Sequence, residues 1–309
     1  MVITNQLTKK QLQNRDSLIT ASLRPDGSPF LITDEYPTVL QHTSTEHSYC
    51  LLKGSTVAAH ANLWPRTLIS ADKLQSYEIG LIGNVATDER YRGQGLMKQL
   101  LDHLKEKAKI QKLDALILWS DLLQFYQKLG FTSFGRERRY QIVRKKIQST
   151  GCSTRQFFPI SANELRPSEL KKMLELRPHT GMTLERKQSE FQALLSIPAT
   201  HIYVSYQDSE LSGFAILGRG CDMIGAIHEW GVTKASDVHV MVSDILDDLK
   251  QEKILLLAPA KLDSNLEKYA EEASESVEDC HMALHMGLSQ RFIASTSHKD
   301  TFIWGLDSI

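Results

Sequence analysis

The stretch VATDERYRGQGLMKQLLDHL, from Val85 to Leu104, decides the fold that we expect for this chain. It leaves an apolar segment, turns through Gly93 and Gly95, and then places apolar residues at helical spacing. The first amides of a helix have no acceptor within the helix, and the helix dipole adds partial positive charge there. Glycines let those amides approach an anion closely, so the stretch predicts a phosphate-binding turn.

Two common phosphate-binding turns do not fit this stretch. A Walker loop needs Gly-Lys-Ser/Thr at the start of the helix, whereas Gly95 is followed by Leu96 and Met97. A dinucleotide-binding fold needs the turn after the first strand of a parallel unit. Here the turn follows what reads as an antiparallel meander, with strands expected at residues 47–52, 55–64 and 77–87.

The elements around the turn favour an α/β protein with a mixed, mostly antiparallel sheet and flanking helices. Residues 96–108 have one apolar helical face, residues 115–119 read as a central strand, and a short helix ends at Gly130. Residues 6–18 predict an N-terminal helix, and residues 18–23 are the candidate for a first strand.

The second part of the chain repeats this order of elements. A length of 309 residues suggests about two domains, and the irregular segment after residue 150 marks the expected boundary. We therefore expect domains at residues 1–150 and 151–309. The second copy has no glycine turn, because its third strand ends in GVTKASDVHVM, from Gly231 to Met241.

Two motifs resemble the Gcn5-related N-acetyltransferase (GNAT) superfamily. Arg90 to Gly95 satisfies the family signature Q/R-x-x-G-x-G/A at the place between the fourth strand and the third helix of that fold. The segment FYQKLGF, from Phe125 to Phe131, resembles a second common segment of the family. The resemblance implies a tandem GNAT fold, with an acetyltransferase domain at residues 1–150 and a degenerate copy at residues 151–309.

The resemblance also implies the ligand and the site. The cosubstrate would be acetyl-CoA, and the acceptor would be an amine of a small molecule or a peptide. Tyr126 would act as the acid for the departing thiolate. The coenzyme would lie along the main chain of Val85, Ala86 and Thr87, with its pyrophosphate on the amides of Arg92, Gly93, Gln94, Gly95, Leu96 and Met97.

The general base stays open at this point. His60 lies in a polar row of the preceding strand, although a lone histidine is more often structural. Glu78 lies one residue out of phase with the glutamate that some relatives use, and a bulge near Gly80 or Gly83 would restore the phase. Ordered water is a third route for the proton.

Composition narrows the classes of function. A net charge of −1 argues against a dedicated nucleic-acid surface, and no apolar run is long enough to cross a bilayer. The N-terminus lacks the apolar region of a secretory signal, so we expect a cytoplasmic protein. The 4 cysteines contain no C-x-x-C pair, so we expect neither disulfides nor a metal site. A non-catalytic acyl-CoA sensor and a GNAT-fold interaction scaffold are the alternatives to an enzyme, and the oligomeric state is not predicted.

Overall fold

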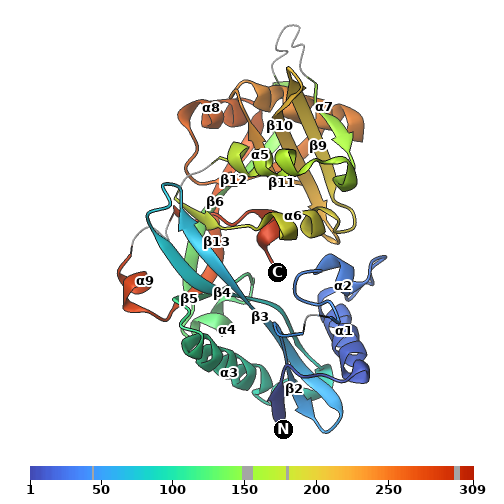
Figure 1. Ribbon diagram of the computed structural model, residues 1–309, viewed down its shortest axis with the longest axis vertical. Coiled ribbons are helices and arrows are strands. Elements are labelled where there is room, and N and C mark those ends of the chain that lie inside the picture. Colours follow the sequence, from blue (N-terminus) through green and yellow to red (C-terminus); the bar gives the residue numbers. More distant parts are fainter. Residues whose placement is uncertain (44, 148–155, 179–180, 296–299) are drawn as a thin grey trace. The chain divides into compact units, whose positions relative to one another are not determined.

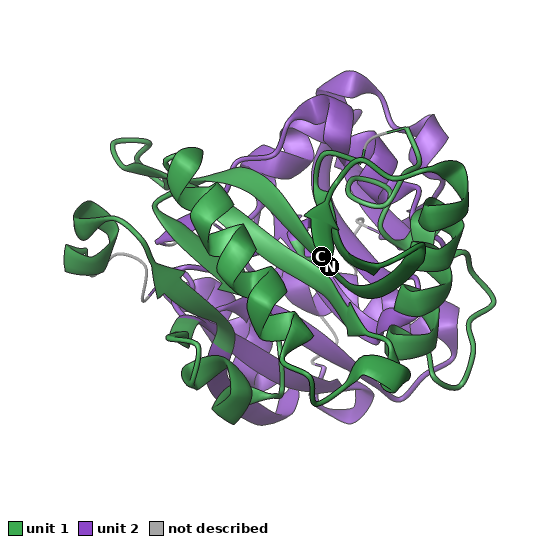
Figure 2. Cartoon of the chain, turned by 90° about the horizontal axis from the view of Figure 1, so that it is seen from below, with its two compact units in different colours: residues 1–134, 282–298, 308–309 green, residues 135–281, 299–307 purple. Residues whose placement is uncertain are grey.

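The computed structural model describes residues 1–43, 45–147, 156–178, 181–295 and 300–309 (Figure 1). The chain forms two compact units, and neither is a continuous half of the sequence (Figure 2). Unit 1 consists of residues 1–134, 282–298 and 308–309, and unit 2 of residues 135–281 and 299–307. The boundary that we expected at residue 150 lies outside the described residues.

Unit 1 is built on a mixed sheet, as the sequence predicts. Only the pairing of β4 with β5 is parallel among the pairings described for this unit, and the others are antiparallel. The strands follow in the order β1 (Val2–Thr4), β2 (Ser48–Lys53), β3 (Thr56–Ser70), β4 (Ser76–Thr87), β5 (Ala115–Leu118) and the end of β13 (Ser274–Gly287).

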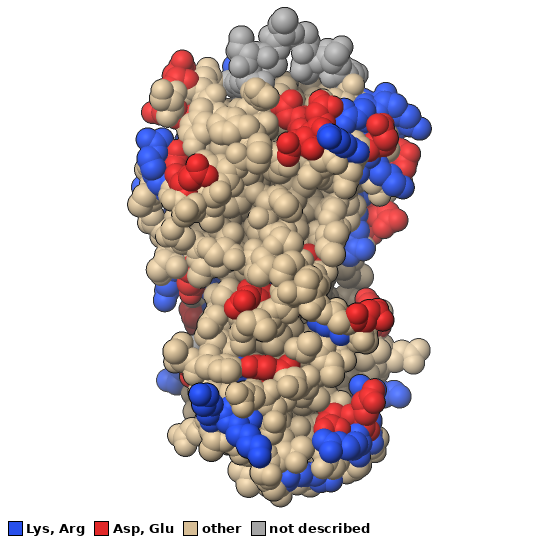
Figure 3. All heavy atoms as spheres, turned by 90° about the vertical axis from the view of Figure 1, so that its right-hand side faces the viewer, with Lys and Arg blue, Asp and Glu red and all other residues tan. Residues whose placement is uncertain are grey.

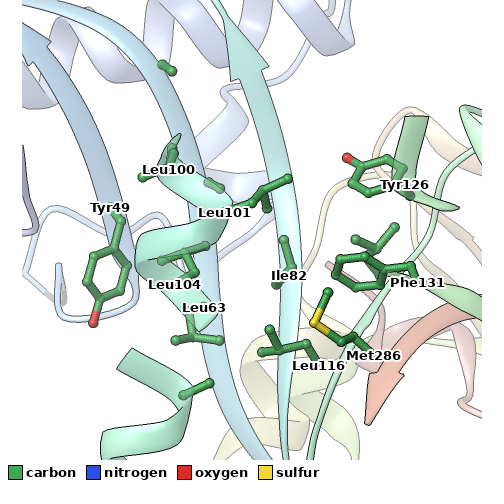
Figure 4. Packing of buried hydrophobic residues seen from close by; sticks show 14 of the residues in the cluster. Tyr49, Leu63, Ile82, Leu100, Leu101, Leu104, Leu116, Tyr126, Phe131 and Met286 are labelled. Carbon is green, nitrogen blue, oxygen red and sulfur yellow. The ribbon is translucent and has the colours of Figure 1, made fainter. Parts of the chain in front are cut away.

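Helices cover both faces of this sheet. The helices of unit 1 are α1 (Lys9–Leu23), α2 (Ile32–Glu35), the 3₁₀ turn η1 (Glu89–Tyr91), α3 (Leu96–Ile110), α4 (Leu123–Gln127) and α9 (Gln290–Ala294). The apolar face expected for residues 96–108 is confirmed, since Leu100 and Leu104 are fully buried and share a core with Leu63 and Ile82 (Figure 4). Leu18 of α1 packs on the opposite face, against a small apolar cluster of β2 and β3.

The suggestion of a first strand at residues 18–23 is wrong. These residues complete α1, which begins with a capping box between Thr8 and Gln11 and continues to Leu23. Ile19 is fully buried on the inner face of this helix. The first strand is instead β1, whose three residues pair with β2.

Unit 2 repeats the arrangement of unit 1. Its strands follow in the order β7 (Phe158–Ile160), β9 (His201–Gln207), β10 (Glu210–Arg219), β11 (Asp222–Val232), β12 (Lys253–Pro259) and β6 (Thr132–Val143). Its helices are α5 (Pro167–Leu176), α6 (Gln188–Leu195), α7 (Asp237–Leu249) and α8 (Ser264–Glu272). The remaining short elements are β8 (Met182–Leu184) and the 3₁₀ turns η2 (Arg144–Lys146), η3 (Ala162–Glu164) and η5 (Gly305–Asp307). β11 and β12 pair in parallel, as β4 and β5 do in unit 1.

Each unit takes one strand from the other part of the sequence. β6 follows α4 along the chain, yet most of it belongs to unit 2, where Tyr140 pairs with Leu256 of β12. β13 follows α8, yet its end belongs to unit 1, where Leu284 pairs with Leu118 of β5. Both pairings are antiparallel and occupy the same place beside the parallel pair. The tandem repeat was predictable from the sequence, but this exchange was not.

Candidate functional site

A β-bulge interrupts β4 just before the glycine turn. Gly83 pairs with Asn62, and the next pair joins Ala86 to His60, so two residues of β4 lie opposite one residue of β3. The first of these two, Asn84, has a φ of 50°, in the left-handed region. A bulge of this kind breaks the regular ladder and re-aims the main chain that follows it.

The same part of β4 separates from β5. The parallel pairing runs from Ile79 opposite Ala115 to Ile82 opposite Leu118, and it ends there. Among the strand pairings that the structure describes, residues 83–87 have no partner on the β5 side. Val85, Ala86 and Thr87, the residues expected to bind the pantetheine arm, therefore lie on an open strand edge. Such an edge can hydrogen-bond an extended ligand in the manner of an added strand.

The side chain of His60 hydrogen-bonds the main chain of the bulge. Its Nδ1 lies 2.8 Å from the carbonyl oxygen of Asn84, which only accepts, so Nδ1 carries the proton. Its Nε2 accepts from the Ser48 hydroxyl at 2.8 Å, and that oxygen accepts from Nη1 of Arg15 at 3.1 Å. Burial, with a smaller contribution from the charge of Arg15, lowers the pKa of His60 to about 3. Both ring nitrogens are therefore occupied, and His60 has no nitrogen free to take a proton from an amine.

Glu78 lies away from the open stretch. It pairs with Thr67 near the start of β4, and the Thr67 hydroxyl donates to its carboxylate at 3.2 Å. The bulge lies just after Gly83, between Glu78 and the glycine turn, as the argument from phase required, but Glu78 itself is exposed near the start of β4. Of the two candidate bases, His60 lies beside the bulge but has no free nitrogen, and Glu78 lies away from residues 83–87.

The glycine turn has the backbone that the motif requires. Gly93 and Gly95 have φ values of 73° and 72°, a region that side chains disfavour, and Gly95 is the N-cap of α3. A Cβ atom at either position would meet nothing within 4 Å, so the turn is open. The Arg92 amide donates to the Glu89 carbonyl within the turn, whereas helix geometry leaves the first amides of α3 without intrahelical acceptors.

A pocket of about 600 Å³ lies between α1 and the segment that leads into this turn. The end of β4 and the turn supply Thr87, Asp88 and Arg92 to its wall, and α1 supplies Asn14 and Ser17. It holds charges of both signs, because two carboxylates, of Asp88 and Glu89, and two guanidinium groups, of Arg90 and Arg92, line it. The pocket is large enough for part of a small molecule and lies beside the segment that leads into the turn.

Tyr126 lies on α4 inside the apolar core of unit 1. Its ring packs edge-on against Phe131, and its hydroxyl points toward β4 (Figure 4). Burial raises the pKa of Tyr126 to about 12, while a hydrogen bond with Ser120 lowers it in part. At neutral pH Tyr126 is a protonated donor.

Ile309 also lies against the open stretch of β4, which nothing in the sequence indicated. A Cβ atom on Gly83 would lie 2.5 Å from the main-chain carbon and oxygen of Ile309. Residues 308–309 belong to unit 1, although they are distant in sequence from β4. Gly83 therefore leaves the space that this main chain occupies.

The corresponding position of unit 2 is built differently. The N-cap of α7 is Ser236, whose φ of −61° and ψ of −22° are right-handed, where α3 has a left-handed glycine. The first residues of α7, Asp237, Val238 and His239, are buried. The start of α7 thus has neither the turn nor the exposure of the start of α3.

Other features of a site are not found in the described part of the chain. Among those residues, no group of three or more His, Cys, Asp or Glu side chains is arranged to hold a metal ion. Cys50, Cys221 and Cys280 form no disulfide, and Cys152 lies outside the described residues. None of the helices in the described ranges is both long and apolar enough to span a bilayer. On the face in Figure 3, basic and acidic side chains are interspersed.

Comparisons with known proteins agree with this geometry. Residues 16–131 match the model of the acetyltransferase (GNAT) family. No curated protein sequence gave a significant match. Among solved structures, a probable N-acyltransferase from Enterococcus faecalis is similar at 15% identity and a TM-score of 0.71, covering 92% of this chain and 71% of its own. A GCN5-related N-acetyltransferase from Anabaena variabilis is similar at 17% identity and a TM-score of 0.68, with coverage of 92% and 72%.

A third similar structure carries its ligand. N-myristoyltransferase from Saccharomyces cerevisiae, with bound myristoyl-CoA, has 10% identity and a TM-score of 0.53, covering 90% of this chain and 80% of its own. At these identities the structures show a shared fold, whereas the family match rests on the segment that contains the bulge, the glycine turn and Tyr126. Residues 16–131 therefore match the acetyltransferase (GNAT) family, and the chain shares its fold with structures of N-acyltransferases.

Proposed function

We propose that unit 1 binds acetyl-CoA and transfers its acetyl group to an amine of a small molecule or a peptide. The observation that carries this proposal is the joint occurrence of three features in one unit. β4 leaves β5 after Ile82, the bulge at Asn84 re-aims its main chain, and the open turn at Gly95 follows directly. An extended arm ending in a diphosphate matches this order, because the strand edge suits the arm and the helix amides suit the phosphates.

The chemistry needs few side chains. The amine nitrogen attacks the thioester carbonyl, a C–N bond forms, the C–S bond breaks, and the proton lost by the amine ends on the coenzyme A sulfur. Tyr126 donates a hydrogen bond to the sulfur as negative charge develops on it. With a pKa of about 12, the phenol stabilises the thiolate as a donor more readily than it surrenders its proton to it. Water removes the amine proton, since neither His60 nor Glu78 is available.

The substitution Tyr126→Phe tests this role. A hydrogen bond to a charged group contributes about 1.5–3 kcal/mol, so kcat should fall about 10- to 100-fold. The affinity for acetyl-CoA should stay within about twofold, because the donor acts on charge that develops during the reaction. Coenzyme A release with a panel of amines and peptide N-termini gives the rate, and calorimetry gives the affinity.

The matched control is Tyr49→Phe, which removes a hydroxyl from another tyrosine of the same apolar cluster. It should leave kcat unchanged. Equal rates for wild type and Tyr126→Phe would contradict the role of Tyr126. Calorimetry on the wild type should find one coenzyme site per chain, because α3 is the only helix in the described residues that begins with an open glycine turn. Two equivalent sites would contradict the assignment to unit 1.

A further inference from the structure

The cations around the glycine turn differ in what they bind. Arg90 lies 2.6 Å from Asp88, and Arg92 lies 3.3 Å from Glu89. In the first turn of α3, Lys98 pairs with Asp102 at 2.7 Å. Each of these charges therefore already has a carboxylate partner.

Lys53 is the exception. Its Nζ donates to Oε1 of Gln94 at 2.9 Å and lies 4.5 Å from the ring centroid of Tyr91. Neither partner carries a charge. Among the residues that the structure describes, no carboxylate forms a salt bridge with Lys53. Its ammonium therefore lies beside the turn with its full charge available to an anion.

The position of Lys53 is set by the tertiary fold. It ends β2, and the hairpin that follows turns at Gly54, whose φ is 61°. Gln94 is the residue between the two glycines of the turn and is 41 positions further along the chain. The hairpin thus brings a lysine to the edge of a turn whose amides come from a different element.

We propose that Lys53 binds a phosphate of the coenzyme and selects for phosphorylated acyl carriers. The inference rests on the proposed function and adds a residue that the family motif does not contain. Coenzyme A carries a 5′-diphosphate and a 3′-phosphate. The main-chain amides at the N-terminus of one helix can bind only one of these two groups. In the bond to Gln94 only the donor is charged, whereas a bond to phosphate joins opposite charges and is stronger, so Nζ exchanges one partner for the other when the coenzyme binds.

Lys53→Met tests the inference, because methionine keeps an apolar stem over Tyr91 and removes the charge. Calorimetry with coenzyme A and with 3′-dephospho-coenzyme A should show about a tenfold loss of affinity for the intact coenzyme, the size expected for one charge-assisted bond. A loss confined to coenzyme A places Lys53 on the 3′-phosphate. An equal loss with both ligands places it on the diphosphate.

Lys98→Met is the matched control, since it removes the same charge from the same neighbourhood but from a lysine with a carboxylate partner. It should change either affinity by less than about twofold. The inference is overturned if Lys53→Met binds both ligands as tightly as wild type does, or if Lys98→Met loses as much affinity. A wild type that binds neither ligand contradicts the proposed function, and the inference with it.

Discussion

Replacing Gly95 by aspartate tests the phosphate-binding turn directly. Gly95 is the N-cap of α3, with a φ of 72° and a ψ of 12°. Nothing lies within 4 Å of the Cβ that a side chain would add, so aspartate fits without a clash. Its carboxylate would lie at the amides that we propose for the pyrophosphate. Gly95→Asn has nearly the same size and shape without the charge, and is the matched control.

The expected effects separate into stability and affinity. Left-handed backbone costs a non-glycine residue about 1 kcal/mol, and this cost falls on the free and the bound protein alike. It therefore lowers the free energy of unfolding in both variants without changing affinity. Repulsion between the carboxylate and a phosphate about 5 Å away, in partly screened surroundings, contributes about 1–2 kcal/mol to binding. Gly95→Asp should bind acetyl-CoA about 5- to 30-fold more weakly than Gly95→Asn.

Calorimetry at low and high salt measures this difference, and circular dichroism verifies that both variants are folded. The difference should shrink at high salt, because salt screens exposed charges. A folded Gly95→Asp variant that binds acetyl-CoA as tightly as Gly95→Asn would refute the assignment of the pyrophosphate to this turn. A loss of the same size in both variants would show that the Cβ, not the charge, is what the site excludes.

Two further predictions concern buried charge. Because the pKa of His60 is lowered to about 3, the unfolded chain takes up a proton below pH 6.5 that the folded protein does not. The contribution of neutral His60 to the free energy of unfolding is therefore complete above pH 6.5 and is lost toward pH 3, at about 1.4 kcal/mol per pH unit. His60→Gln should make the free energy of unfolding, measured by urea titration, fall less steeply with pH in this range. Equal pH dependence in wild type and variant would contradict the assignment. Glu229 binds Arg186 through two bonds of 2.7 and 2.8 Å, and both side chains are fully buried. Glu229→Gln should therefore lower the free energy of unfolding by about 3–5 kcal/mol. The control Asp102→Asn, on the exposed face of α3, should lower it by less than about 1 kcal/mol, and equal losses in the two variants would refute the reasoning.

The sequence by itself determined the local part of this protein. The limits of β4 and α3, the left-handed glycines between them and the buried face of the helix follow from period and residue type within a few turns of chain. The family resemblance followed from the same segment, because a phosphate-binding turn is a short-range structure. The repeat of this order of elements in the second part was visible for the same reason.

Only the tertiary structure decided the rest, because it depends on pairs that are distant in sequence. The main chain of Ile309 against Gly83 and the bond from Lys53 to Gln94 leave no periodic signal in either partner. His60 looked like a candidate base in the sequence, and burial beside the bulge makes it a support for β4 instead. The exchange of β6 and β13 could not be predicted either. Alternating apolar and polar residues show that a segment pairs as a strand, but not which strand it pairs with.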